Sequence, residues 1–267
     1  MNYRLVAIDM DGTTLNSKHK ISLENLDTIK KVHELGVKVI IMTGRMYYSA
    51  LEYYNKIGLD TLIVTYNGGK IHDFNGNIKY KKELSNDVVS KLLKLPNLKE
   101  NKVLPLFFID EKLVVPWYDE NTEEYEMRTG IKAIVDENIL KKTFETTKFL
   151  LSSTNYKYLD FLKDNIIKTF GNSLYITNSM PRYVEVLNKE VSKGNALIYC
   201  SDYYNIPLNQ CVVIGDNNND SAMFLPEVYK IAVKNAEQNL KNLADFITES
   251  NDCNGVSLAL RKIFFGE

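Results

Sequence analysis

Near the N-terminus the chain reads Leu5-Val6-Ala7-Ile8-Asp9-Met10-Asp11-Gly12-Thr13-Thr14. The first four residues form a continuous apolar run, which is typical of a strand buried on both faces of a parallel sheet. Asp9 and Asp11 follow two residues apart, and extended backbone places such side chains on one side. Gly12 permits a sharp turn directly after them. The stretch predicts a central strand ending in two carboxylates, although a strand-ending turn capped by an aspartate would explain it too.

Strand and helix patterns alternate outward from this stretch. Apolar runs predict strands, and amphipathic segments closed by Gly36 and Gly58 predict helices. The expected strands are 37–42 and 62–64, and the expected helices are 22–35, capped by Ser22, and 46–57. Such alternation indicates a parallel sheet with right-handed crossovers. Asn75-Gly76 between two further short runs predicts a hairpin.

The pattern changes near Leu84 and returns near Lys193. The middle third mixes alternating strands with a helix at 158–170, which is typical of an α+β unit. Its expected strands are 107–109, 113–115, 148–151, 174–176 and 183–186. After Lys193 we expect a helix, a strand at 211–214, another helix, and strands at 231–233 and 246–248. The prediction is a Rossmann-like, doubly wound α/β core (1–83 and 189–267) with an inserted α+β domain (84–188).

Three more polar segments follow apolar runs of the predicted core. They are Thr43-Gly44-Arg45, Lys193-Gly194 and Gly215-Asp216-Asn217-Asn218-Asn219-Asp220. Each has a plain structural explanation on its own: a helix cap, a surface lysine and a polar turn. Ligands of open α/β sheets bind outside the carboxyl ends of the strands, however, where all of these segments are expected.

Taken together, the segments place four carboxylates at one edge: those of Asp9, Asp11, Asp216 and Asp220. Two such charges about 4 Å apart repel by roughly 4 kcal/mol at an effective dielectric constant of 20. The cluster therefore predicts either raised pKa values or a bound divalent cation, and hard oxygen ligands suit Mg²⁺. Thr43 at a helix N-terminus and Lys193 supply what a phosphate dianion needs.

In this order, the four segments resemble the four motifs of the haloacid dehalogenase superfamily of phosphotransferases. The long insertion is similar to the α/β cap of its Cof-type subfamily, which contains many phosphatases of sugar phosphates and other small metabolites. Tyr66-Asn67-Gly68-Gly69 and Glu185-Val186 resemble that subfamily too. Met10, Thr14 and Gly69 depart from the usual residues at positions without a catalytic role.

The resemblance implies hydrolysis of phosphate monoesters through an aspartyl-phosphate. Asp9 would be the nucleophile, Asp11 the general acid and base, and Lys193 would neutralise charge. Mg²⁺ would be held by Asp9, the Asp11 carbonyl, Asp216 and Asp220. The expected substrate-binding residues are Thr43, Gly44, Arg45, Asn67, Gly68, Lys193 and Asn219. No role is assigned to His19, His33 and His72, because these motifs offer them no acidic partner.

Composition excludes several other classes of protein. Lysine and arginine number 33 against 34 acids, so the basic excess of a nucleic-acid-binding protein is missing. No apolar run of about 18 residues suggests a membrane span. Three widely spaced cysteines favour neither disulfides nor zinc, and a cytoplasmic location is expected. The expected partner is a small phosphorylated metabolite, with no nucleic acid, membrane or obligate protein partner.

Two other functions remain open at this point. A phosphotransferase or mutase would pass the phosphoryl group to a sugar instead of water. A phospho-acceptor regulatory protein also uses acids at strand ends, Mg²⁺, a threonine and a lysine. It would not need an insertion of about a hundred residues, and its aspartyl-phosphate would persist.

Overall fold

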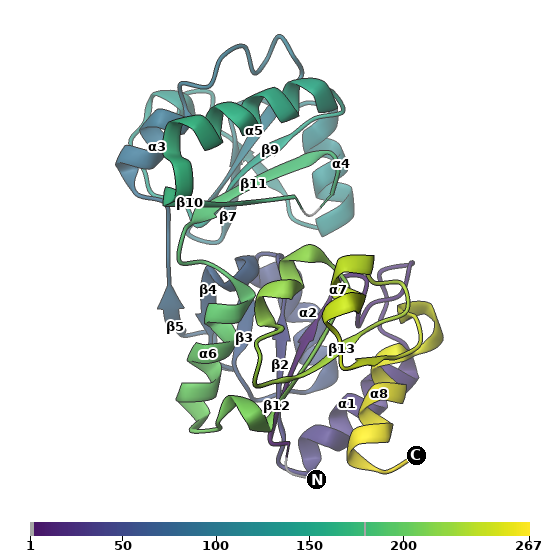
Figure 1. The fold of residues 1–267 in the computed structure, drawn as a ribbon. Coiled ribbons are helices and arrows are strands. Elements are labelled where there is room, and N and C mark those ends of the chain that lie inside the picture. Colours follow the sequence, from purple (N-terminus) through teal and green to yellow (C-terminus); the bar gives the residue numbers. More distant parts are fainter. Residues whose placement is uncertain (1–2, 179) are drawn as a thin grey trace. The chain divides into compact units, whose positions relative to one another are not determined.

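The computed structural model describes residues 3–178 and 180–267, which divide into two compact units (Figure 1). The first unit comprises Met1–Arg45, Ala50–Tyr80 and Ser192–Glu267. The second comprises Met46–Ser49 and Lys81–Val191. Segments from both ends of the chain therefore build one unit, and the middle third builds the other.

An eight-stranded sheet forms the centre of the first unit, in the order β14-β13-β12-β1-β2-β3-β4-β5. Its strands are β1 (Leu5–Asp9), β2 (Lys38–Met42), β3 (Ile63–Thr65), β4 (Lys70–His72), β5 (Ile78–Lys81), β12 (Cys211–Gly215), β13 (Tyr229–Ala232) and β14 (Phe246–Ile247). In this order, each strand from β14 through β12 and β1 to β3 pairs in parallel with the next. Strand β4 pairs antiparallel with β3. The predicted parallel sheet and the hairpin at Asn75-Gly76 are confirmed.

The position of β1 in this sheet follows from its sequence. Val6 pairs with Val212 on one side and with Val39 on the other, and the whole of β1 is buried. A strand covered on both faces and both edges has no room for a polar side chain before its end. Asp9, the last residue of β1, is therefore the first position at which the strand can present a carboxylate.

In the described residues, five α-helices lie wholly or mostly in the first unit. They are α1 (Leu23–Glu34), α2 (Tyr47–Ile57), α6 (Lys193–Tyr204), α7 (Gln238–Leu243) and α8 (Gly255–Phe264). Ser22 caps α1 as predicted, accepting a hydrogen bond from the Asn25 amide at 3.1 Å. Among the residues that the structure describes, no helix is long and apolar enough to cross a lipid bilayer.

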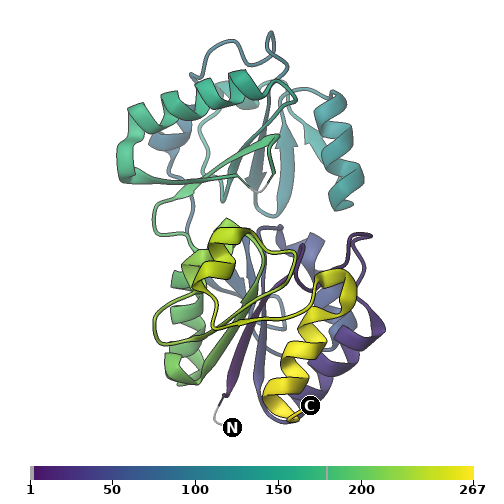
Figure 2. The ribbon, with the colours of Figure 1, turned by 45° about the vertical axis from the view of Figure 1, so that its right-hand side comes forward.

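The sequence prediction ended at the strand 246–248 and missed α8. This helix packs beside α1 (Figures 1 and 2). Thr28 Oγ1 lies 2.7 Å from Ser257 Oγ, and the Asn25 carboxamide accepts from the Ser257 amide at 2.9 Å. All three side chains are buried. Buried polar pairs therefore help to join the two helices.

The prediction of a helix before strand β13 is wrong about the type of helix. The chain instead forms a short 3₁₀ helix, η5 (Asn218–Met223). Its first turn is fixed by Asp220, whose Oδ2 accepts from the amides of Asp216 and Asn217 at 2.9 and 3.0 Å. Pro226 follows soon after η5, and proline cannot continue a helix, so a long helix does not fit here.

The second unit contains a six-stranded sheet in the order β10-β11-β9-β6-β7-β8. Its strands are β6 (Leu104–Ile109), β7 (Lys112–Val115), β8 (Ala133–Val135), β9 (Phe149–Ser152), β10 (Leu174–Thr177) and β11 (Tyr183–Asn188). Only the β7–β8 pair is parallel among the pairs described. Its helices are α3 (Asn86–Leu92), α4 (Glu120–Thr129) and α5 (Tyr156–Phe170). The predicted α+β character is confirmed.

One apolar core joins this sheet to α3 and α5. It includes Val89, Leu92, Phe107, Phe149, Leu151, Leu159, Leu162, Ile166, Val184 and Val186, all buried. Trp117, the single tryptophan of the chain, packs against it from a partly buried position. Tryptophan fluorescence therefore reports on the packing of the second unit.

Replacing Phe149 by alanine should destabilise the second unit. Phe149 is fully buried, and such a deletion costs about 3–5 kcal/mol. The urea midpoint followed by Trp117 fluorescence should fall clearly in Phe149→Ala. Phe161→Ala is the matched control, because Phe161 is 47% exposed in the same unit, and its midpoint should barely move. Equal shifts in both variants would contradict this description of the core.

Candidate active site

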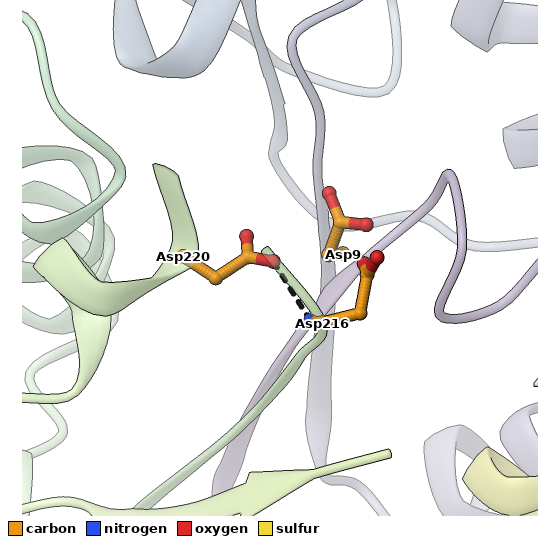
Figure 3. A group of neighbouring side chains, drawn as sticks. All are labelled: Asp9, Asp216 and Asp220. Atoms are coloured by element: carbon orange, nitrogen blue, oxygen red, sulfur yellow. Dashed lines mark hydrogen bonds between the residues drawn. The ribbon is translucent and has the colours of Figure 1, made fainter. Parts of the chain in front are cut away.

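Three aspartates meet where β1 and β12 end (Figure 3). Asp9 closes β1, Asp216 follows β12, and Asp220 lies in η5. One oxygen atom of each carboxylate lies within 4.8 Å of the other two. Asp9 and Asp220 are buried and Asp216 is half-buried. The structure thus brings together three of the four carboxylates that the sequence places at this edge.

Two glycines allow the carboxylates to approach the backbone closely. Gly12 has a φ of +81°, and a Cβ there would lie 2.4 Å from Asp216 Oδ2. A Cβ on Gly215 would lie 2.6 Å from the Asp220 Cβ. Thr13 adds a hydrogen bond from its hydroxyl to Asp216 Oδ1 at 2.8 Å, a contact that the sequence did not predict.

Lys193 is the positive charge at the centre of this cluster. It is the first residue of α6 and is fully buried, although sequence alone also allowed an exposed lysine. Its ammonium group donates to Asp9 Oδ1 and, at 2.5 Å, to Asp220 Oδ1. Burial by itself disfavours the charge, but Asp220 and Asp9 outweigh it and raise the pKa of Lys193.

The carboxylates carry more negative charge than Lys193 can balance. Burial, then repulsion by Asp220, raises the pKa of Asp9 well above its ordinary value, against the pull of Lys193. Burial and Asp220 likewise raise the pKa of Asp216 to about 7. A cation would relieve this repulsion, and the donors are all hard oxygen atoms. The residues present therefore fit a divalent metal ion.

The side chain of Asp11 has a different partner from the other three. Its carboxylate forms a two-point ion pair with Arg45, from Nε to Oδ2 at 2.7 Å and from Nη2 to Oδ1 at 2.5 Å. The Arg45 guanidinium also lies over the Tyr53 ring, 5.3 Å from its centroid. Such fork-shaped pairs fix both side chains in orientation. Arg45 thus orients Asp11, a contact that the sequence did not predict.

Two of the histidines have acidic neighbours after all. His19 Nδ1 lies 3.8 Å from Asp11 Oδ1, and His33 Nε2 lies 3.1 Å from Asp60 Oδ1. The expectation that they lack an acidic partner among the motifs is therefore wrong for His19. The proximity of His19 to Asp11 could not be predicted from their spacing in the sequence. It arises because residues 16–20 form a turn that brings His19, with a φ of +53°, back toward Asp11.

The remaining predicted site residues lie on neighbouring loops. Asp9 is level with Met42 on β2, so Thr43 stands one residue beyond it. Thr43 is buried, and its hydroxyl accepts from the Arg45 amide at 3.1 Å. The Asn219 carboxamide donates to Asn67 Oδ1 at 3.0 Å. The loops after β2, β3 and β12 therefore meet beside the acidic cluster.

The chain is similar to known hydrolases and phosphatases over nearly its whole length. The model of the haloacid dehalogenase-like hydrolase family matches residues 6–260. The 5-amino-6-(5-phospho-D-ribitylamino)uracil phosphatase YcsE of Bacillus subtilis is 30% identical, covering 98% of this chain and 96% of its own. Phosphatase YwpJ of the same organism is 25% identical, covering 97% and 99%.

Solved structures are similar over nearly the whole chain. TM0651 from Thermotoga maritima has a TM-score of 0.86 at 29% identity, with 97% of each chain covered. A haloacid dehalogenase-like hydrolase from Bacteroides thetaiotaomicron has a TM-score of 0.89 at 25% identity, covering 98% of this chain and 100% of its own.

Gly12→Ala should weaken the binding of a divalent cation. The added Cβ would displace the Asp216 carboxylate from the cluster, so we expect at least about tenfold weaker binding of Mn²⁺ by calorimetry, on the scale of losing one well-placed ligand contact. Gly36→Ala is the matched control: Gly36 has a φ of +87° but open space around it. Both variants strain the backbone, so equal loss of Mn²⁺ affinity in both would argue against a metal site built on Asp216.

Proposed function

The chain belongs to the haloacid dehalogenase-like hydrolases and hydrolyses phosphoric monoesters, and we propose that it does so with Mg²⁺, through an aspartyl-phosphate, on small metabolites. The observation that carries the proposal is the buried Asp9, held by Lys193 and flanked by Asp216 and Asp220. The name of the relative YcsE specifies a phosphorylated small molecule, which supports that class of substrate.

Asp9 is the proposed nucleophile. It lies at the end of a rigid central strand, and Lys193 opposes the effects that raise its pKa. An oxygen of Asp9 attacks phosphorus, the new O–P bond forms, and the bond to the leaving oxygen breaks. Water then attacks the phosphorus of the aspartyl-phosphate, which releases inorganic phosphate and restores the Asp9 carboxylate.

Asp11 is the proposed general acid and base. It gives its proton to the leaving oxygen and later takes one from the attacking water, as microscopic reversibility requires. Arg45 donates to both oxygens of Asp11, so we expect this pair to loosen when Asp11 carries a proton. Arg45 is then left beside the reacting group as a cation.

Charge at the phosphoryl group is balanced by several groups. We assign Thr43, the Gly44 amide, Lys193 and Asn219 to the phosphoryl oxygens. Mg²⁺, held by Asp9, Asp216, Asp220 and the Asp11 carbonyl, would supply positive charge that offsets the repulsion between carboxylates and phosphate. Lys193 cannot neutralise all of the carboxylates around it. Without a cation, their remaining negative charge would repel an anionic substrate.

Substrate choice is assigned to the insertion. We propose that residues 84–188, which lie within the second unit, act as a cap that selects the leaving group and limits access of water. The substrate is a small phosphorylated metabolite, the partner class expected from the sequence. Release of inorganic phosphate from a panel of phosphate esters tests this, and transfer to a sugar without release would indicate a mutase.

Removal of divalent cations should abolish phosphate release. Excess chelator should stop turnover, added Mg²⁺ should restore it, and Ca²⁺ should restore it poorly, because its larger and looser shell misplaces Asp9. Phosphate release from p-nitrophenyl phosphate measures turnover under each condition: with chelator, with added Mg²⁺ and with added Ca²⁺. Full activity in chelator would refute the metal requirement.

Asp9→Asn should lower turnover by about 10⁴-fold or more, as loss of a nucleophile does elsewhere. The amide is nearly the same size but cannot form the phosphoryl ester. Asp27→Asn is the control, because Asp27 is an exposed partner of Lys31 on α1, and its turnover should equal that of the wild type. Wild-type rates in Asp9→Asn would place the chemistry elsewhere.

A further inference from the structure

Three consecutive residues after β3 have left-handed backbone. The φ angles of Tyr66, Asn67 and Gly68 are 53°, 57° and 101°. All three residues are buried. Left-handed conformation is unfavourable for an aromatic residue, and such strain persists only where surrounding contacts hold it. The contacts of this turn therefore identify the segments that stabilise its unfavourable backbone conformation.

The first set of contacts is to the loop after β2. The Tyr66 amide donates to the Arg45 carbonyl and the Asn67 amide to the Thr43 carbonyl, both at 2.9 Å. A Cβ on Gly44 would lie 2.9 Å from Asn67 Oδ1, so the Asn67 carboxamide packs directly on this glycine. The turn thereby fixes the backbone of the loop whose amide and hydroxyl are assigned to phosphate.

The other contacts reach two more phosphate-binding segments. Asn67 Oδ1 accepts from Asn219 Nδ2 at 3.0 Å. A Cβ on Gly68 would lie 2.4 Å from the carbonyl oxygen of Ser192, the N-cap of α6 and the residue before Lys193. One strained turn therefore touches the loop after β2, η5 and the start of α6.

We propose that Asn67 is a positioning residue that acts through Asn219 and the Thr43-Gly44 loop, and that it does not itself bind the phosphate. This inference rests on the proposed function. It revises the sequence prediction that Asn67 and Gly68 contact substrate. With one hydrogen of its amide nitrogen held by Asn67, Asn219 points the other in a fixed direction before substrate arrives. Such preorganisation lowers the cost of binding an anion.

The test is a double-mutant cycle read by inhibition with inorganic phosphate. Asn67→Gly keeps the left-handed backbone at no steric cost but removes the carboxamide. Asn219→Ala removes the donor. Each single variant should raise the inhibition constant of phosphate by about tenfold, as loss of one hydrogen bond to a charged group does. Because part of the effect of Asn67 acts through Asn219, the double variant should raise the inhibition constant by clearly less than the product of the two single effects.

The matched control is Asn205→Gly. Asn205 also has left-handed backbone, with a φ of 52°, but it caps the C-terminal end of α6. Asn205→Gly makes the same change at a left-handed residue away from the site, and it should leave the inhibition constant of phosphate unchanged. If Asn67→Gly does not fold, Asn67→Ala replaces it in the cycle, because alanine also lacks the carboxamide that binds Asn219.

Three results would overturn the proposal. They are an unchanged phosphate inhibition constant in Asn67→Gly, effects that multiply in the double variant, and an equal effect in Asn205→Gly. Failure of the proposed function looks different: the wild type would hydrolyse none of the esters. The cycle would then be measured by calorimetric binding of inorganic phosphate, with the same expected coupling.

Discussion

A buried ammonium group between two buried carboxylates is the constraint on which the site depends. Removing Lys193, Asp9 and Asp220 from water costs several kcal/mol for each ion, and breaking up such a cluster leaves an uncompensated charge. Strand β1, helix α6 and η5 must therefore meet at one place. The parallel pairing of β1 with β12 brings Asp9 and Asp216 to the same edge of the sheet.

Around this cluster, glycines determine how closely the carboxylates approach the backbone, and polar side chains determine the orientation of the functional groups. Gly12 and Gly215 let Asp216 and Asp220 approach the backbone more closely than any side chain would allow. Arg45 orients Asp11, and Asn67 orients Asn219. The chemistry thus uses a few charged groups, while the residues between them determine where those groups point.

Much of this could be predicted from the sequence, for identifiable reasons. Apolar runs such as Leu5–Ile8 are typical of strands buried on both faces, so the parallel sheet was predictable, whereas the order of its strands came from the structure. Polar residues after those runs located Asp9, Asp216 and Asp220. The structure was needed where side chains distant in sequence meet: the Arg45–Asp11 pair, the turn that returns His19, and the buried contacts of α8. It was also needed for α4, which the sequence analysis did not predict. The sequence of α4 is largely polar, and the helix begins at the Asp119 cap and ends at Gly130.

The central claim is that Asp9 carries the phosphoryl group during turnover. The most direct measurement is mass spectrometry of enzyme mixed with a phosphate ester and quenched in acid within one turnover. The account predicts the mass of one phosphoryl group on the peptide containing Asp9, labile to hydroxylamine. Phosphate release in the first turnover with an unmodified Asp9 peptide, or with the label on another residue, would contradict it.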